Sequence, residues 1–259
     1  MASNSDEVVL RDGKIGRWLR FRRPRRVLQT TESRDVMPLL EEVATRARVD
    51  GLYAAGFVSY EAAPGFDAAL TVNDAGSFPL VWFGLYETPE VVEMGEQADA
   101  GSAADLDWRP SISQDAYRAA IGHIKEQIAA GRTYQVNYSL RLRAAFDHDP
   151  WAYFLQLVRA QEAPYGAYVD SGRYAICCAS PELFFRLEDG RLTARPMKGT
   201  APRGLTWAGD RAQAAWLQQS EKNRAENVMI VDMIRNDMGR VAQMGSVAAP
   251  QLFTVEKYP

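Results

Sequence analysis

Hydrophobic positions along the chain recur at two spacings, one typical of amphipathic helices and one typical of strands. Ser113 stands before a helical run as an N-cap candidate, and Gly51 and Gly131 follow two of the helical runs, where glycine commonly ends a helix. The helical spacing predicts helices over residues 27–52, 113–131, 151–159 and 210–240. The extended pattern predicts strands over 52–60, 78–86, 134–142, a hairpin around 168–178 turning at 170–172, and a strand-like tail over 246–259.

The stretch from residue 180 to residue 204 contains two short extended runs, 183–187 and 191–195, separated by Glu188-Asp189-Gly190. Asp-Gly between two such runs is a strong signal for a β-hairpin. Glu182 and Lys198 then stand at the outer ends of the two strands. Because a hairpin brings its outer ends together, the sequence predicts an acid and an amine within reach of one small molecule.

Two further segments leave alternatives open. In 134–142 the polar positions between the apolar ones are uncharged at Gln135, Asn137 and Ser139, which fits a water-filled cavity or an ordinary solvent-facing side of a strand. The apolar stripe of 221–240 is broad, so that helix is predicted to be largely buried. Its Glu226 either pairs with Lys222, one turn earlier, or binds something else.

Composition narrows the classes of function. The net charge is −3 and the sequence pI is about 5.6, which does not favour a nucleic-acid or membrane-surface partner. The basic run 17–26 indicates a solvated edge strand or, as the alternative, an anion site. No apolar run reaches the length of a membrane span, and the polar start shows no secretory signal. The adjacent Cys177 and Cys178 are expected to fill core space, which fits a cytoplasmic protein.

The apolar content, 47% of 259 residues, is enough for one large domain or two smaller ones. Residues 93–107 are acidic, small and aperiodic. We therefore expect an N-terminal segment over 1–95, an exposed loop over 96–107 and a second region over 108–259.

Several sequence blocks, which occur in the same order as in the family, resemble those of the chorismate-utilising enzymes. Within that family they are most similar to the branch of aminodeoxychorismate synthase component I. The similarity runs from about residue 50 to the end. The blocks are Gly56-Phe57-Val58-Ser59-Tyr60-Glu61-Ala62-Ala63, Tyr134-Gln135-Val136-Asn137, Ala163-Pro164-Tyr165-Gly166-Ala167-Tyr168, Ser180-Pro181-Glu182, Arg195-Pro196-Met197-Lys198-Gly199-Thr200-Ala201-Pro202-Arg203, Glu221-Lys222-Asn223-Arg224-Ala225-Glu226-Asn227 and Arg235-Asn236-Asp237-Met238-Gly239-Arg240-Val241.

The resemblance implies an α+β fold, with two mostly antiparallel sheets packed as a sandwich and helices outside. Two positions separate the branches of the family. Anthranilate synthases carry a small residue where this chain has Lys198, and isochorismate and salicylate synthases carry a water-activating lysine where it has Gln135. The pair Lys198 and Gln135 is therefore the combination that resembles aminodeoxychorismate synthases, with 108–259 as the chorismate-binding catalytic region.

The implied reaction replaces the C4 hydroxyl of chorismate by an amino group with its configuration retained. By resemblance Lys198 is a covalent nucleophile that attacks C2, and ammonia from a separate glutamine amidotransferase subunit then attacks C4. Glu182 would protonate the departing hydroxyl. Gly199, Thr200 and Gln135 would contact the substrate, and Glu226 would be one ligand of a Mg²⁺ that neutralises the substrate carboxylate.

The family pattern also implies what this sequence lacks. The remaining third of a full component I, with a Gly-rich block, a substrate-binding arginine and a second Mg²⁺ glutamate, is not present, so we expect a fold that is incomplete at its C-terminus and little activity of this chain alone. Pro164, Tyr165 and Gly166 match part of an effector pocket whose N-terminal half has no counterpart. Two alternatives stay open: a truncated chorismate- or effector-binding module without turnover, and anthranilate synthase component I, against which Lys198 argues.

Overall fold

The structure is a computed structural model that describes residues 5–14, 16–93 and 106–258. It contains two compact units, one made from residues 1–98 together with 154–259, and one from residues 99–153. The loop predicted over 96–107 lies almost wholly outside the described residues. The division into a segment over 1–95 and a catalytic region over 108–259 stays a prediction.

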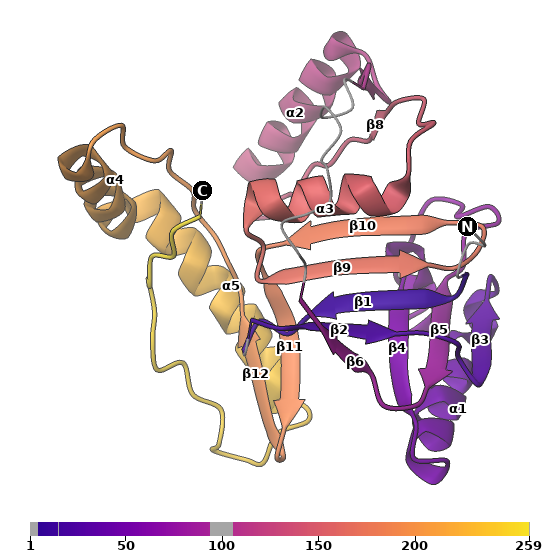
Figure 1. Cartoon of the computed structure of the whole chain (residues 1–259). Helices are drawn as coiled ribbons and strands as arrows, with labels where there is room; N and C mark the ends of the chain where they lie inside the picture. Colours follow the sequence, from indigo (N-terminus) through magenta and orange to yellow (C-terminus); the bar gives the residue numbers. More distant parts are fainter. Residues whose placement is uncertain (1–4, 15, 94–105, 259) are drawn as a thin grey trace. The chain divides into compact units, whose positions relative to one another are not determined.

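A five-stranded antiparallel sheet forms one layer of the larger unit (Figure 1). The N-terminal strand β1 lies at its centre and pairs with a strand more than 150 residues later, with Val8 opposite Val169. The strands, in the order in which they lie side by side, are β10 (Ala175–Ser180), β9 (Tyr165–Asp170), β1 (Glu7–Arg11), β2 (Trp18–Phe21) and β6 (Glu90–Val92). The hairpin predicted around 168–178 is confirmed as β9 and β10.

A second, three-stranded antiparallel sheet has the order β3 (Arg26–Thr30), β5 (Val81–Tyr86), β4 (Tyr53–Val58). The strands predicted over 52–60 and 78–86 are thus present. The helix predicted over 27–52 begins later, because Arg26–Thr30 pairs with β5 and only Val36–Val49 is helical, as α1. A short 3-10 turn, η1 (Ser33–Asp35), separates them, and a second, η2 (Tyr60–Gly65), follows β4.

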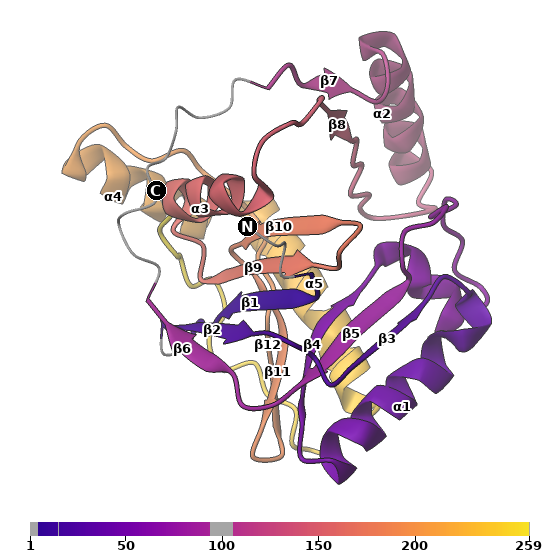
Figure 2. The same ribbon diagram turned by 45° about the vertical axis from the view of Figure 1, so that its right-hand side comes forward.

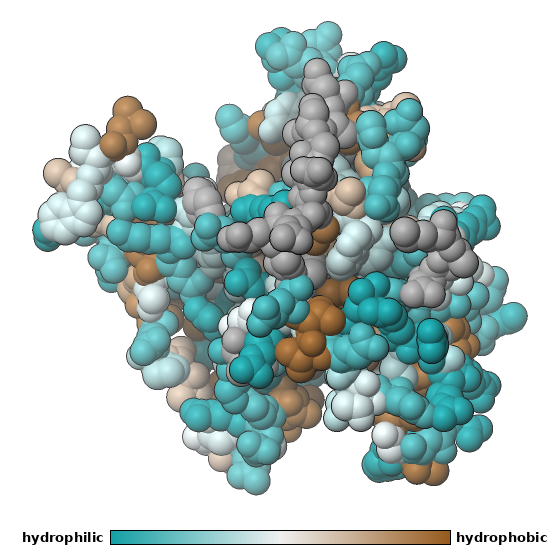
Figure 3. Space-filling view, viewed as in Figure 1, coloured by the Kyte–Doolittle hydropathy of each residue, from teal (hydrophilic) through white to brown (hydrophobic). Residues whose placement is uncertain are grey.

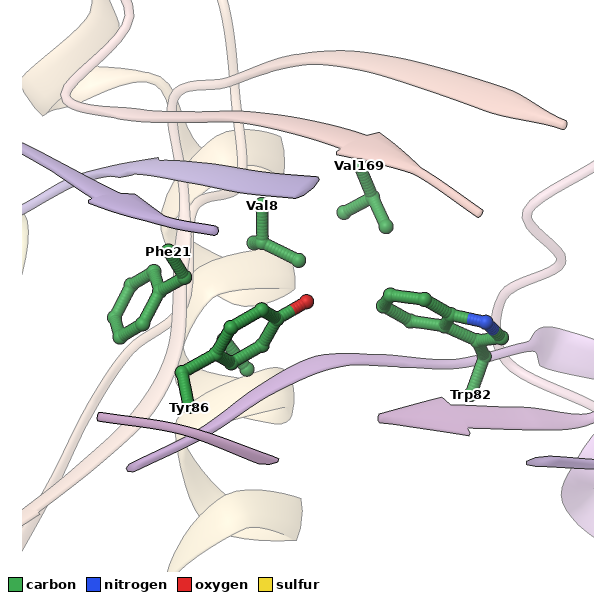
Figure 4. Packing of buried hydrophobic residues seen from close by; sticks show 6 residues of the cluster. Val8, Phe21, Trp82, Tyr86 and Val169 are labelled. Carbon is green, nitrogen blue, oxygen red and sulfur yellow. The ribbon is translucent and has the colours of Figure 1, made fainter. Parts of the chain in front are cut away.

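The main core lies between these two sheets (Figure 4). Trp82 and Tyr86 reach from β5 toward Val8, Phe21 and Val169 of the facing sheet, and all five are almost completely buried. The Tyr86 hydroxyl donates a 3.0 Å hydrogen bond to the Asp6 carbonyl, so its polar end is satisfied inside the core. Burial of large side chains from both layers holds the sandwich together.

Helices cover the outer faces of the two layers (Figure 2). Helix α1 packs Val43 onto Leu28 and Leu85 of the three-stranded sheet. On the other layer, Phe154 of α3 (Pro150–Gln161) meets Trp18 edge to face, with ring centroids 5.7 Å apart. The predicted sandwich of two antiparallel sheets with helices outside is therefore confirmed, and so is the helix predicted over 151–159.

The basic run does not form an edge strand as predicted, because β2 lies between β1 and β6. Four of its arginines, at positions 20, 22, 25 and 26, meet carboxylates instead. Arg20 donates a 2.6 Å hydrogen bond to the buried Glu7, and Arg22 contacts Glu90 at 3.2 Å. These ion pairs make the run part of the framework of the sheet.

The chain then forms a two-stranded hairpin, β11 (Leu183–Glu188) with β12 (Arg191–Arg195), followed by α4 (Trp207–Gln219) and α5 (Glu221–Gly239). The single helical region predicted from residue 210 is two helices, because the extended Ser220 ends α4 and caps α5. The prediction that the second helix is largely buried is wrong: no residue of α5 is buried, and Val228 and Met233 are about half exposed. The strand predicted over 246–259 is not formed in 246–258.

The smaller unit contains helix α2 (Gln114–Ala129) and one short ladder of β7 (Arg109–Pro110) with β8 (Leu142–Arg143). Ser113 caps α2 as predicted, accepting a 3.2 Å hydrogen bond from the Ala116 amide. The strand predicted over 134–142 is wrong for 134–141, which have no regular structure. Alternation predicts which sides of an extended segment are polar, but a strand also needs a partner, and β7 supplies only two paired positions.

The face shown in Figure 3 is mostly hydrophilic, with hydrophobic side chains in small separate groups. Among the described helices, none combines the length and the apolar character needed to cross a bilayer.

Candidate active site

The hairpin β11–β12 positions the candidate acid. Its turn has positive φ at Asp189 (49°) and Gly190 (73°), the conformation of a type I′ turn, which favours Asp-Gly. At the opposite, open end, the Glu182 carboxylate accepts a 2.8 Å hydrogen bond from the Met197 amide. The predicted hairpin is thus present, and it holds the Glu182 side chain against the residue that precedes Lys198.

Gly199 shapes the backbone next to the candidate nucleophile. Its φ is +82°, a left-handed conformation that glycine adopts freely and other residues adopt at a cost. A Cβ at this position would lie 3.1 Å from three side-chain atoms of Asn223, in the first turn of α5. Gly199 therefore allows the backbone to pass close to the start of α5, and Lys198 beside it is half-buried.

A cavity of about 910 Å³ opens beside this segment. Its walls come from β12, the segment 196–203, α4, α5 and the C-terminal segment 248–258. The volume suits a small organic ligand. Of the residues predicted for the site, Lys198, Gly199 and Thr200 line the cavity, whereas Glu182 and Glu226 do not.

One wall of the cavity carries an unsatisfied acceptor. The Oδ1 atom of Asn227 is buried and has no hydrogen-bond partner among the described residues. Buried polar atoms normally have partners, so this oxygen is an acceptor that a donor on a ligand could satisfy. Sequence reasoning placed Asn227 only inside a matching block and assigned it no role.

The predicted metal ligand Glu226 lies on α5 with its side chain 27% exposed. It contacts Lys222 at 3.8 Å, the pairing that the sequence left as the simpler alternative. Among the described residues, no group of three or more His, Cys, Asp or Glu side chains is arranged to hold a metal ion. Because Mg²⁺ commonly takes one or two carboxylates and completes its shell with water and substrate oxygens, a single protein carboxylate is compatible with such a site, and the role of Glu226 stays a prediction.

Gln135 belongs to the smaller unit and lies in the irregular segment 134–141. Its carbonyl accepts a 3.2 Å hydrogen bond from the Thr133 hydroxyl, and its residue is half-buried.

The segment predicted as part of an effector pocket begins β9. Gly166 lies against Trp18, where a Cβ would come within 2.7 Å of the indole, and Gly13 lies against the Tyr165 ring in the same way. Trp18 is 9% exposed. The space beside Gly166 is therefore filled by an indole of this chain.

Comparison with known proteins identifies the family. The sequence profile described as chorismate binding enzyme matches residues 6–259. The chain belongs to the chorismate binding enzyme family. The resemblance seen in the sequence blocks is thereby confirmed at the level of the family.

Curated relatives include aminodeoxychorismate synthases and anthranilate synthases. The chain is 43% identical over 152 residues to aminodeoxychorismate synthase component 1 of Salmonella typhimurium, an alignment that covers 59% of this chain and 34% of the relative. It is 36% identical over 178 residues to anthranilate synthase component 1 of Pseudomonas putida, covering 68% of this chain and 36% of the relative. The chain thus matches about a third of the length of these relatives.

A solved structure supports the fold of this family member. The anthranilate synthase component I of Streptococcus pneumoniae superimposes with a TM-score of 0.67 at 23% identity, over 81% of this chain and 55% of that one. At this identity the likeness establishes the chorismate-utilising fold.

In this family member, charged contacts that sequence reasoning missed surround the Lys198 segment. Arg203 and Lys257 both bind the Asp210 carboxylate, with shortest distances of 2.6 and 2.8 Å, and hydrogen bonds from these two cations hold the pKa of Asp210 well below its usual range. Burial, together with its hydrogen bond to Glu256, raises the pKa of Tyr258 to about 12. No local pattern signals the contact of Lys257 with Asp210, because the two residues lie 47 positions apart in the sequence.

Proposed function

We propose that this chain carries chorismate-converting machinery of an aminodeoxychorismate synthase, forming 4-amino-4-deoxychorismate from chorismate and ammonia. The observation that carries the proposal is the placement of Lys198. Its side chain lines a cavity of suitable size, and the backbone amide just before it is bonded to the Glu182 carboxylate. The names of the relatives from Salmonella and from Pseudomonas support chorismate as the substrate class, and Lys198 favours the amino-deoxy product.

The proposed reaction has two displacements. In the first, the neutral Lys198 amine forms a bond from Nζ to C2 of chorismate, both ring double bonds shift, and the C4–O bond breaks. Glu182 gives its proton to the departing oxygen, which leaves as water. In the second, ammonia bonds to C4, the double bonds shift back, and the C2–Nζ bond breaks, which returns the neutral Lys198 amine. The ammonium group formed at C4 then gives a proton back to the Glu182 carboxylate. One direct displacement would invert the configuration at C4, whereas these two successive displacements allow it to be retained.

Glu182 does not line the cavity in this structure, so the acid role requires its side chain to exchange the Met197 amide for the substrate. Glu182 is exposed, which leaves the side chain room to rotate. When Mg²⁺ is bound, it would neutralise the substrate carboxylate, and Glu226 would be its protein ligand from α5. Thr200 and the unsatisfied Oδ1 of Asn227 would contribute a hydroxyl and an acceptor toward the substrate. Ammonia would come from a glutamine amidotransferase partner.

The test is product formation. The chain is incubated with chorismate, Mg²⁺ and ammonium chloride, and the products are separated and identified by mass. In keeping with the little activity expected of this chain alone, we expect a small amount of 4-amino-4-deoxychorismate from the unaltered chain and an equal amount from Lys125→Ala, a control on the exposed surface of α2. We expect none from Lys198→Ala. Anthranilate as the product, or unchanged turnover by Lys198→Ala, would contradict the proposal.

One observation favours a second candidate, a chorismate-binding module without turnover. The Glu182 carboxylate is engaged by the Met197 amide and lies outside the cavity lining. Saturable binding of chorismate, measured by calorimetry, with no product and no covalent adduct would support this candidate over the enzyme.

A further inference from the structure

The segment that carries Lys198 has little secondary structure of its own to hold it. Residues 196–206 form neither helix nor strand. A segment without a backbone ladder keeps one conformation only through the contacts that its side chains and its ends make. The precision with which Lys198 faces the cavity therefore depends on those contacts.

Both ends of this segment are bound by three consecutive residues of the C-terminal segment. At the start, Arg195 forms an ion pair with Glu256. At the far end, Arg203 donates a 2.8 Å hydrogen bond to the Tyr258 carbonyl, and Lys257 shares the Asp210 carboxylate with Arg203. Residues 256–258, which we call the clasp, thus bracket the nucleophile segment.

Tyr258 also reaches the open end of the hairpin. Its hydroxyl donates to Glu256 Oε2 at 2.6 Å and lies 3.3 Å from the Pro181 carbonyl and 3.8 Å from the Met197 sulfur. Pro181 precedes Glu182 and Met197 precedes Lys198. One hydroxyl therefore contacts the neighbours of both the candidate acid and the candidate nucleophile.

We propose that the clasp residues are positioning residues, which hold Lys198 and Glu182 in the relative placement that the reaction needs. The Tyr258 hydroxyl and Glu256 are the most important of them. This inference rests on the proposed function for its catalytic consequence. The clasp residues belong to one wall of the cavity, and in this proposal they act through the backbone of 181–182 and 195–203.

Two measurements test the proposal on the whole chain. Hydrogen exchange of amides 197–201 reports the order of the segment without requiring activity. The rate of covalent adduct formation on Lys198 with chorismate, as a function of chorismate concentration, reports its alignment. The variants are Tyr258→Phe and Glu256→Leu, with Glu256→Gln as the conservative variant that keeps an acceptor for Tyr258. Tyr174→Phe is the matched control, because its hydroxyl meets Ser77 at 2.8 Å, away from the cavity lining.

We expect amides 197–201 to exchange about tenfold faster in Tyr258→Phe and Glu256→Leu than in the control, the factor that one lost hydrogen bond of typical strength gives. The adduct rate at saturating chorismate should fall by about the same factor, while the half-saturating concentration and the urea midpoint of unfolding stay unchanged. Glu256→Gln should recover most of the rate, a recovery that general destabilisation would not produce.

Exchange and adduct rates equal to those of Tyr174→Phe would overturn the proposal, and so would a raised half-saturating concentration at an unchanged maximal rate. If Tyr258→Phe does not fold, Glu256→Leu and Glu256→Gln decide in its place. Absence of any adduct on the unaltered chain would count against the proposed function instead, and the exchange comparison would still decide whether the clasp orders the segment.

Discussion

Gly199 determines how the backbone passes from Lys198 to the start of α5. Its positive φ and its contact with Asn223 leave no room for a side chain without strain. The sequence indicated a glycine inside a recognisable block, but its conformation follows from the packing of α5, which lies more than twenty residues further on.

Replacing Gly199 by alanine is expected to lower the free energy of unfolding by about 1–2 kcal/mol, the cost of a left-handed conformation in a residue with a Cβ. The urea midpoint measures this. Gly239→Ala is the matched control, because Gly239 ends α5 in the same unit and nothing lies near its potential Cβ. An equal loss in both variants would contradict the assigned role of the Gly199 conformation.

Asp210 makes a pH-dependent contribution to stability. Hydrogen bonds from Arg203 and Lys257 lower its pKa in the folded protein, so folding favours the ionised form. The resulting stabilisation is complete above the pKa of the unfolded chain, about 4, and is lost as the pH falls below it. We expect Asp210→Asn to be less stable than the unaltered chain at pH 7, with the difference shrinking between about pH 5 and pH 2.

The measurement is a series of urea unfolding curves across that range. Asp237→Asn serves as the control, since it removes a carboxylate from an exposed position on α5. A difference between Asp210→Asn and the unaltered chain that stays constant with pH would contradict the assignment.

At the scale of elements, the sequence correctly predicted turns and caps that are formed by residues close together in the chain. The Asp189-Gly190 turn and the cap at Ser113 were correctly predicted, because the interactions that form them lie within a few residues. Two predictions that depended on a distant partner were wrong. Residues 26–30 form a strand because β5 pairs with them, whereas 134–141 do not, although their alternation is more regular.

The helix pair α4–α5 depends on Ser220. Its hydroxyl accepts hydrogen bonds from the Asn223 amide at 3.4 Å and from the Asn223 side chain at 3.0 Å. Ser220→Ala removes both and is expected to cost about 1 kcal/mol, whereas Ser220→Asp keeps an acceptor and should cost less. Thermal unfolding followed by circular dichroism measures both. Equal losses in the two variants would show that the cap does not hold the start of α5.

At the scale of the whole molecule, the sandwich was predicted through the family blocks. Composition and periodicity alone predicted strands. They did not predict that β1 pairs with β9 or that the clasp contacts the hairpin, because each of these contacts joins residues far apart in the sequence. The roles of the predicted site residues stay predictions, and the sequence did not predict the ion pairs of Arg203 and Lys257 with Asp210.

The stability of the sandwich is expected to depend strongly on Trp82, which is 1% exposed between the two sheets. Trp82→Ala should lower the free energy of unfolding by about 3–5 kcal/mol because it leaves a large cavity. Trp216→Ala, on the exposed surface of α4, should change it by less than about 0.5 kcal/mol. Denaturant unfolding followed by circular dichroism compares the two, and similar losses would contradict the location of the core.

The proposed function requires Lys198 to act as a covalent nucleophile toward chorismate. The most direct measurement is the mass of the chain after incubation with chorismate and Mg²⁺ without ammonia, followed by peptide mapping. We predict an added mass equal to chorismate less one water, located on Lys198, absent from Lys198→Ala and present in Lys125→Ala. An unmodified Lys198 under conditions in which chorismate is bound or converted would contradict the account.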